Sequence, residues 1–274
     1  MPDLHDLRNL TDDLPVRGEV MPLLFVGHGN PMNAIEDNEF SRGWAEIARH
    51  LPPPAAVLCV SAHWQTDRTL VTTMQQPRTI HDFYGFPEEL FAVQYPAPGH
   101  PGLAAETQAL LHRAAAGPDV RWGLDHGCWS VLRAMYPRAD VPVVQLSLDM
   151  SRPSSWHYDL GKDLATLRSK GVLIIGSGDI VHNLGLVDWE HPDGAYDWAQ
   201  EMNETFKSSM IRNDHRPLIE YQSFGRGAAL AIPTPDHYLP LLYILALQRN
   251  GESIDFFNDR VIMGSLSMTS FTIK

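Results

Sequence analysis

The sequence is poor in cysteine, has no long apolar run and lacks an excess of positive charge, and each shortage excludes a class of protein. The chain of 274 residues has two cysteines, Cys59 and Cys128. Two cysteines cannot form the disulfide framework of a small secreted protein, so we expect a reducing compartment, the cytoplasm. No stretch approaches the roughly 18 apolar residues of a membrane span. The acidic start MPDLHDLRNLTDDLP is unlike a signal peptide.

Acidic residues outnumber basic ones. The chain has 33 Asp and Glu against 21 Lys and Arg, a formal net charge of −12. An acidic surface repels phosphate backbones and anionic lipid, so we expect neither nucleic acid nor a membrane as a partner. The length suits one large α/β domain or two small ones, and the absence of an internal repeat or a convincing linker favours one. We expect an N-terminal extension over residues 1–20, with weak helical character at best, and a single domain over 21–274 that works as a monomer or a small homo-oligomer.

Short apolar runs separated by helical patterns predict the fold class. Most of the runs are continuous rather than alternating, as expected for strands that are buried on both faces. Because strands alternate with helices, the sequence predicts an α/β fold with a central, mostly parallel sheet covered by helices on both faces. The predicted strands lie at 22–27, 55–62, 142–148, 171–178, 227–232 and 261–268.

Helix signals lie between these runs. Apolar residues recur at helical spacing over 154–169, behind Ser154 as a candidate N-cap, and again over 195–212. Pro101 is typical of the first turn of a helix. Asp236 is a candidate cap for the apolar helix that follows it.

The histidines stand out by their positions. The chain has 13 of them, and four follow predicted strands. In an open parallel sheet, ligands bind beyond the carboxyl ends of the strands, so residues far apart in sequence can converge there. Imidazole binds iron, zinc and copper. A single histidine in a turn is usually only a hydrogen-bonded or solvated side chain, but four at equivalent positions favour a metal site: His28, His63, His182 and His237.

Other residues are further candidates for parts of the same site. His126, in GLDHGCWSVL, is either a turn residue beside a helix start or an acid–base group of the same pocket. His81 and His100 are weaker candidates, and we expect at least one of them to be solvent-exposed. Gly27 and Gly29 flank His28, where they allow a sharp turn and leave room near the backbone.

An ordered set of short segments carries a family resemblance. The segments are FVGHGNPM, VSAHW, IHDFYGFP, YPAPGHP, GLDHGCWSVL, GSGDIVHNL, PTPDHYLPLLY and SMTSF. As a set they resemble the class III extradiol ring-cleavage dioxygenases, in the DOPA 4,5-dioxygenase-like branch. They cover nearly the whole chain after residue 20. The resemblance implies an α/β fold and makes residues 21–274 one catalytic domain of this kind.

The resemblance also implies roles for the histidines. By motif, His28, His63 and His237 match metal ligands. His182 matches a position that either completes the coordination or serves as an acid–base residue, and His126 matches a further pocket base. The implied reaction opens a catechol-type ring, DOPA-like or related, with O₂ and yields a semialdehyde.

The implied working metal is Fe(II). Ring-cleaving iron sites usually combine two histidines with one carboxylate. Here Asp236 adjoins His237, and because adjacent side chains point in different directions, both are not expected to bind one ion. An all-histidine set also takes Zn(II), so zinc can be the ion carried by isolated protein.

The segment 76–100 does not fit the strand–helix alternation. It is rich in proline, glycine and aromatic residues. It is either a functional loop or a surface excursion that packs on its own scaffold. In the functional interpretation, Tyr84, Phe86 and Tyr95 form a wall that orients the ring and excludes water.

Two other functions use the same residues. A zinc hydrolase would activate water with His182 or His126 as base, but the sequence has no HExxH motif. A non-catalytic binding member of the fold would be expected to lose ligands or bases, whereas all five histidine motifs are intact here. The dioxygenase is therefore the favoured interpretation.

Overall fold

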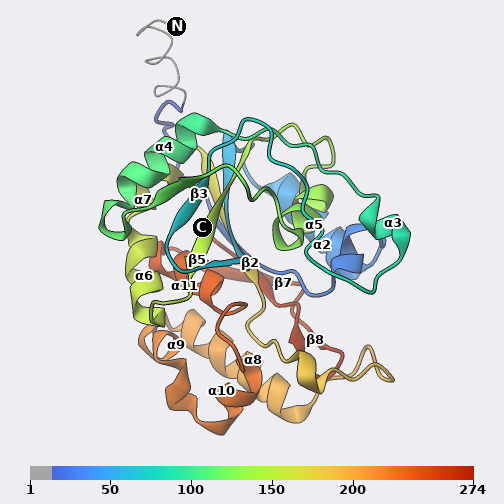
Figure 1. The fold of residues 1–274 in the computed structure, drawn as a ribbon. Coiled ribbons are helices and arrows are strands. Elements are labelled where there is room, and N and C mark those ends of the chain that lie inside the picture. Colours follow the sequence, from blue (N-terminus) through green and yellow to red (C-terminus); the bar gives the residue numbers. More distant parts are fainter. Residues whose placement is uncertain (1–13) are drawn as a thin grey trace, which may run out of the picture.

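A computed structural model describes residues 14–274, whose core is an eight-stranded sheet in the order β4-β3-β5-β2-β6-β1-β10-β7 (Figure 1). The remaining strands β8 and β9 form a two-stranded sheet. The expectation for the N-terminal extension falls largely on residues 1–13, outside the described residues. The strands are β1 Leu23–Gly27, β2 Ala56–Thr66, β3 Leu70–Thr72, β4 Gly117–Asp119, β5 Val143–Asp149, β6 Val172–Gly178, β7 Ile254–Phe257, β8 Val261–Ile262, β9 Leu266–Ser267 and β10 Ser270–Ile273.

The four central strands run parallel. β1 pairs with β6, β6 with β2, and β2 with β5, all in parallel registers. Beyond β1, the strands β10 and β7 join antiparallel, and β3 joins β5 antiparallel on the other side. The prediction of a central, mostly parallel sheet is confirmed, with antiparallel strands added at both sides.

Each central strand buries side chains on both faces. Along β1, Leu23 and Phe25 belong to one hydrophobic core, whereas Leu24 and Val26 belong to the other. Because successive side chains of a strand point to opposite faces, a strand covered on both sides must be apolar throughout. This alternation explains the continuous apolar runs of the sequence.

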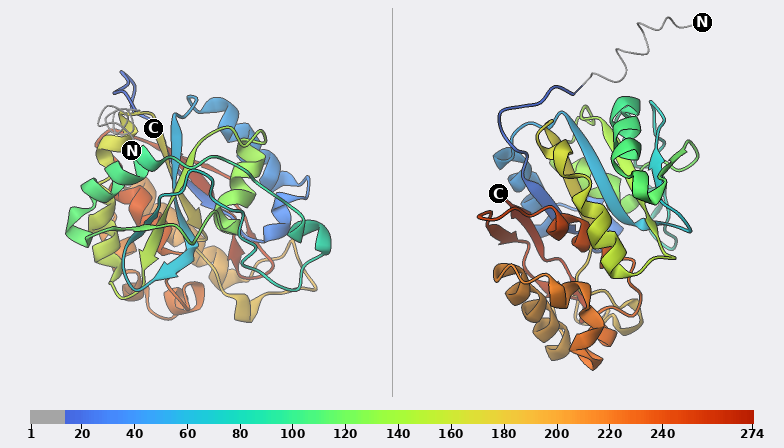
Figure 2. Two further views of the ribbon diagram at one scale, coloured as in Figure 1. Left: turned by 45° about the horizontal axis from the view of Figure 1, so that its top comes forward. Right: turned by 90° about the vertical axis from the view of Figure 1, so that its left-hand side faces the viewer.

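Helices cover both faces of the sheet, as expected. They are α2 Glu39–His50, α3 Glu88–Phe91, α4 Pro101–Leu110, α5 His126–Met135, α6 Ser154–Lys162, α7 Ala165–Arg168, α8 Asp197–Ile211, α9 Arg216–Ile219, α10 Arg226–Ala231 and α11 Leu239–Ala246. Apolar residues of α6, α7 and α11 pack in one core, and those of α2 and α5 pack in the other. In the right-hand view of Figure 2, α8, α9 and α10 gather at the lower end of the molecule.

Two of the predicted strands are wrong. Residues 227–232 lie largely in the helix α10, because a short apolar run does not distinguish strand from helix and this one is rich in alanine, the strongest helix former. Residues 261–268 form a hairpin of β8 and β9 instead of one strand. The hairpin reverses at Met263 and Gly264, which both have positive φ. His237 therefore follows a helix and not a strand.

The helix predictions need smaller corrections. Pro101 is the first residue of α4, as expected. The helical pattern over 154–169 is divided between α6 and α7, and α6 already begins at Ser154, with Pro153 in the N-cap position. Asp236 does not cap α11, which begins at Leu239, because its carboxylate contacts a neighbouring histidine instead.

Within residues 14–274, no helix combines the length and the apolar character that crossing a bilayer requires.

Candidate functional site

A sharp turn at the end of β1 presents His28. Gly29 has φ +56°, a conformation that disfavours side chains, and a Cβ on it would clash with Met268 Sδ. A Cβ on Gly27 would meet the Met268 backbone at 2.6 Å. Both glycines are thus required, since Met268 fills the space beside the turn. His28 itself is buried, and its backbone N–H donates to the Gly178 carbonyl at the end of β6.

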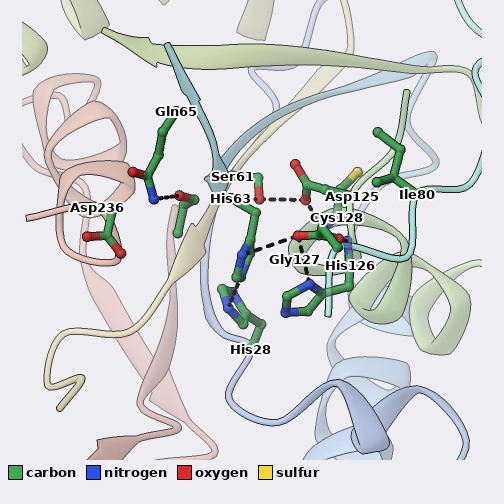
Figure 3. Close-up of polar contacts among 12 residues, drawn as sticks. His28, Ser61, His63, Gln65, Ile80, Asp125, His126, Gly127, Cys128 and Asp236 are labelled. Atoms are coloured by element: carbon green, nitrogen blue, oxygen red, sulfur yellow. Dashed lines mark hydrogen bonds and ion pairs between the residues drawn. The ribbon is translucent and has the colours of Figure 1, made fainter. Parts of the chain in front are cut away.

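The imidazoles of His28 and His63 face each other through their Nε2 atoms, which lie 3.0 Å apart (Figure 3). Nδ1 of His28 lies 3.0 Å from Ser177 Oγ, whose own proton goes to the Gly127 carbonyl. That hydroxyl therefore accepts from His28 Nδ1–H, which leaves the His28 Nε2 lone pair free. Nδ1 of His63 lies 3.3 Å from a carboxylate oxygen of Asp82. Two Nε2 lone pairs directed at one point are the arrangement that a shared cation stabilises.

Asp82 also holds His126, the first residue of α5. Its carboxylate accepts from the His126 backbone N–H at 2.9 Å and from its Nδ1 at 3.0 Å. Burial raises the pKa of Asp82, but the hydrogen bonds and charge of His126 outweigh burial and lower it overall. The carboxylate is therefore ionised, and it directs the Nε2 atoms of His63 and His126 into the site.

His237 and His182 form the opposite side of the site. Nδ1 of His237 lies 2.5 Å from Asp236 Oδ2, so Asp236 orients this ring and does not compete with it for an ion. The ring of His182 stacks on that of His237, with 3.5 Å between centroids and 6° between planes. Burial lowers the pKa of His28 and of His63, with neighbouring histidine charges adding to the effect, and burial lowers the pKa of His182 to about 2. The rings of His28, His63 and His182 are therefore neutral, as metal binding requires.

The donor atoms gather in two groups that share His28. One group is formed by His28, His63 and His126, the other by His28, Asp179 and His237, and within each group the donor atoms lie within 4.8 Å of one another. The ring centroids of His28, His63 and His237 are 4.9, 5.2 and 5.0 Å apart, a nearly equilateral triangle. Among the described residues, His182 is in neither group.

Asp179 and Asp82 were missed by the sequence interpretation. Asp179 follows β6 directly, in the same segment as His182, and is buried. Its Oδ1 accepts from the Gly29 N–H at 3.2 Å, and burial raises its pKa well above the usual range. The available signal was position, since Asp179 occupies a strand end just as His28 does.

A buried network ties the strand that carries His63 to the helix that begins with His126. Asp125, the N-cap of α5, accepts from Ser61 Oγ at 2.6 Å and from Gln145 Nε2 at 2.7 Å. Burial raises the pKa of Asp125, and the charge of Asp82 adds to this. Strands β2 and β5 and helix α5 thus hold the two histidine rings at 3.8 Å between centroids.

The aromatic segment 76–100 borders the site, but through a different residue than expected. The Phe83 ring lies 5.5 Å from that of His126, and Phe86 packs on Phe83. Tyr84 is 92% exposed. Tyr95 is buried in the core, where its hydroxyl donates to the Tyr136 carbonyl. The prediction that Tyr84 and Tyr95 help to form the wall is therefore wrong. The Tyr84 side chain points to solvent, and the Tyr95 side chain points into the core.

His81 and His100, the weaker candidates for the site, have structural roles. Nδ1 of His100 accepts from the Leu103 N–H at the start of α4. Nε2 of His81 contacts the Val93 carbonyl at 2.9 Å. Both are partly buried, so the expectation that one of them is exposed is wrong.

A mostly parallel α/β sheet that brings histidines and carboxylates together beyond its strand ends defines a site that can hold a metal ion. The family described as the catalytic LigB subunit of aromatic ring-opening dioxygenase matches residues 22–254. The chain belongs to this family, the class III extradiol dioxygenases, in their DOPA dioxygenase-like branch. The resemblance noted from the sequence is confirmed.

Relatives match over most of their length. The chain is 45% identical to the 4,5-DOPA dioxygenase extradiol of Escherichia coli (strain K12), covering 96% of this chain and 98% of that one. It is 38% identical to the enzyme of the same name from Beta vulgaris, covering 79% and 83%. A crystal structure of an uncharacterized Escherichia coli K12 protein matches with a TM-score of 0.81 and 43% identity, covering 93% and 100%.

Proposed function

We propose that the protein is a metal-dependent extradiol dioxygenase that opens a catechol-type ring with O₂, with Fe(II) as the working ion. The observation that carries the proposal is the convergence of the His28 and His63 Nε2 atoms at 3.0 Å, with Ser177 Oγ at Nδ1 of His28 and the Asp82 carboxylate 3.3 Å from Nδ1 of His63. The ring-opening family and the DOPA dioxygenases among the relatives support a DOPA-like or related catechol as substrate.

Three histidines fit a single ion. Burial keeps the His28 and His63 rings neutral, and Asp236 orients the His237 ring through its Nδ1. The three ring centroids form the triangle of 4.9, 5.2 and 5.0 Å. Imidazole suits both iron and zinc, so zinc can occupy the same site in isolated protein. Bound Fe(II) would supply a Lewis acid and a redox partner for bringing catechol and O₂ together.

The remaining histidines suit proton transfer. Opening the ring requires that a catechol hydroxyl lose its proton, and a neutral imidazole within reach accepts it. His126 is fitted to this task because the Asp82 carboxylate at its Nδ1 stabilises the imidazolium that forms. His182 lies outside both donor groups of the described residues. Its position favours a second acid–base role over a role as ligand, but its pKa of about 2 makes it a weak proton acceptor, so the deprotonation is assigned first to His126.

The loop that carries Phe83 contributes orientation. Its ring stands edge-on to His126, with 80° between planes, and presents an apolar surface to a substrate ring beside that base.

The reaction balances without a further reductant. Both atoms of O₂ end in the product, a ring-opened semialdehyde acid.

A reconstitution experiment tests the proposal. Metal-free protein is loaded with Fe(II) or Zn(II) without air, mixed with a panel of catechols that includes DOPA, and then exposed to O₂. We expect O₂ uptake and a yellow ring-opened product with Fe(II) alone. Failure with every catechol would contradict the dioxygenase, and hydrolysis of an ester panel by the zinc form together with that failure would favour the zinc hydrolase instead.

A further inference from the structure

The side chain of Asp179 has an unexplained oxygen. Asp179 is 1% exposed, and its Oδ2 has no hydrogen-bond partner in the part of the chain that the structure describes. Leaving a buried polar atom unpaired costs roughly 1–3 kcal/mol, and more for a charged one. The other oxygen, Oδ1, is occupied by the Gly29 N–H. The hydrogen bond to the turn after β1 therefore accounts for only one of the two carboxylate oxygens.

The unpaired carboxylate lies among metal-type donors. One oxygen of Asp179 and one ring nitrogen each of His28 and His237 lie within 4.8 Å of one another, and all three residues are buried. Donors that share one ion at about 2.1 Å are roughly 3–4 Å apart, so a small adjustment closes this group around a cation. The backbone fixes the group as well, because the Asp179 N–H donates to the His237 carbonyl at 2.9 Å.

We propose that Asp179 is an anionic ligand of the metal centre, joining the histidines and giving the site the histidine–carboxylate character of iron oxygenases. This inference rests on the proposed function, in which His28 and His237 hold the ion. It also assigns the two nearby carboxylates different tasks. Asp236 is committed to Nδ1 of its neighbour His237, whereas Asp179 has an oxygen available.

A carboxylate ligand changes which ion the site prefers. Neutral imidazoles alone favour zinc and copper, whereas a carboxylate adds negative charge and a hard donor, which suits Fe(II) and Mn(II). We therefore expect Asp179 to contribute more to Mn(II) and Fe(II) affinity than to Zn(II) affinity. The competing explanation is that Asp179 is a protonated residue that only anchors Gly29.

The variant Asp179→Asn separates these explanations. The amide keeps the volume and the acceptor for the Gly29 N–H, as a protonated acid would, but cannot supply an anionic ligand. Metal-free wild-type and variant proteins are titrated with Mn(II) and Zn(II) against a chromophoric chelator. We expect Asp179→Asn to weaken Mn(II) binding at least tenfold, and to weaken Zn(II) binding less. Unchanged affinities for both ions overturn the inference.

Asp163→Asn is the matched control. Asp163 also has a buried Oδ2 with no partner within residues 14–274, and it pairs with Arg113 away from the site. Its variant should bind both ions like wild type. If Asp179→Asn does not fold, infrared difference spectra of wild-type protein with and without Zn(II) answer the question, since ligation must change a carboxyl band and an unchanged spectrum overturns the inference. Metal binding is measured without catechol or O₂, so absence of ring opening would refute the proposed function and leave the Asp179 result standing.

Discussion

Nε2 of His28 and Nε2 of His63 face each other at 3.0 Å, while Nδ1 of His28 contacts Ser177 Oγ and Nδ1 of His63 lies 3.3 Å from the Asp82 carboxylate. In the tautomers that direct both Nε2 lone pairs into the site, the lone pairs repel at this distance until a cation binds. A bound ion converts that repulsion into coordination, so metal binding should stabilise the folded protein. At a free ion concentration of 100 times Kd the gain is about 2.7 kcal/mol, which raises Tm by on the order of 5–10 °C for a chain of this size.

Differential scanning calorimetry of chelator-treated and Fe(II)- or Zn(II)-loaded protein measures this gain. His63→Ala is the informative variant, because it removes one of the facing nitrogens. We expect the variant to lose catalytic activity, to retain little metal and to show almost no rise in Tm on metal addition. A variant with full activity and wild-type metal content would remove His63 from the site.

Asp82→Asn tests the orientation of the two bases. The amide keeps the shape of the side chain but loses the negative charge that both His63 and His126 face. Losing such a partner typically costs 10- to 100-fold in activity or metal affinity, and we expect kcat to fall in that range. Steady-state kinetics measure the effect. The control is Asp67→Asn, whose side chain is 94% exposed, and equal kinetics for the two variants would contradict the assigned role.

Much of the site follows from the order of strands and turns. His28 and His63 could be predicted because they follow, or end, apolar runs that become parallel neighbours of β6, and parallel strands bring their carboxyl ends to one edge. His126 could be predicted only as a candidate. Its neighbour in space is Asp82, in a loop whose path no local pattern specifies.

The errors have physical causes as well. The alanine-rich run at 227–232 satisfied the apolar pattern of a buried strand, but strong helix formers made it part of α10. Tyr84 and Tyr95 were grouped by their proximity in sequence, yet one is exposed and the other lies in the core. Asp179 was overlooked because a carboxylate at a strand end reveals its importance only once its burial is known.

Gly127→Ala tests how tightly the site is packed. A Cβ at Gly127, the second residue of α5, would lie 2.6 Å from Ser61 Oγ and 2.9 Å from His63 Cδ2. Real side chains do not approach so closely, so the His63 ring must move. A displacement near 1 Å can cost on the order of 100-fold in rate, and we expect kcat/KM to fall by about that factor while the circular dichroism spectrum stays native.

Gly18→Ala provides the comparison for this substitution. Within the described structure a Cβ on Gly18 meets nothing inside 4 Å, and its φ is not positive. The Gly18 variant should match wild type in kcat/KM and in Tm. Wild-type kinetics for Gly127→Ala would show that the site accommodates a methyl group and that His63 is held less firmly than its contacts indicate.

His157 should make the stability depend on pH. It is fully buried between α6 and α11, with Nδ1 3.0 Å from the Tyr243 hydroxyl and Nε2 3.1 Å from the Asp149 carbonyl. Burial lowers its pKa from 6.5 to about 4, and contacts with Asp149 offset this only in part. Between pH 4 and pH 6.5 the unfolded chain binds more protons than the native one, so acid destabilises the fold. The contribution of neutral His157 to the free energy of unfolding is fully present above pH 6.5 and is lost as the pH drops toward 4.

Between pH 7 and pH 5, the titration of His157 alone should lower the free energy of unfolding by about 2 kcal/mol. His157→Gln keeps a polar side chain that does not titrate, so its free energy of unfolding should fall by about that much less over the same interval, even if the variant is less stable at pH 7. Urea denaturation at both pH values measures the difference. His50→Gln, at an exposed position, should retain the wild-type pH dependence. If His157→Gln retains it too, the buried imidazole is not the group whose protonation destabilises the fold.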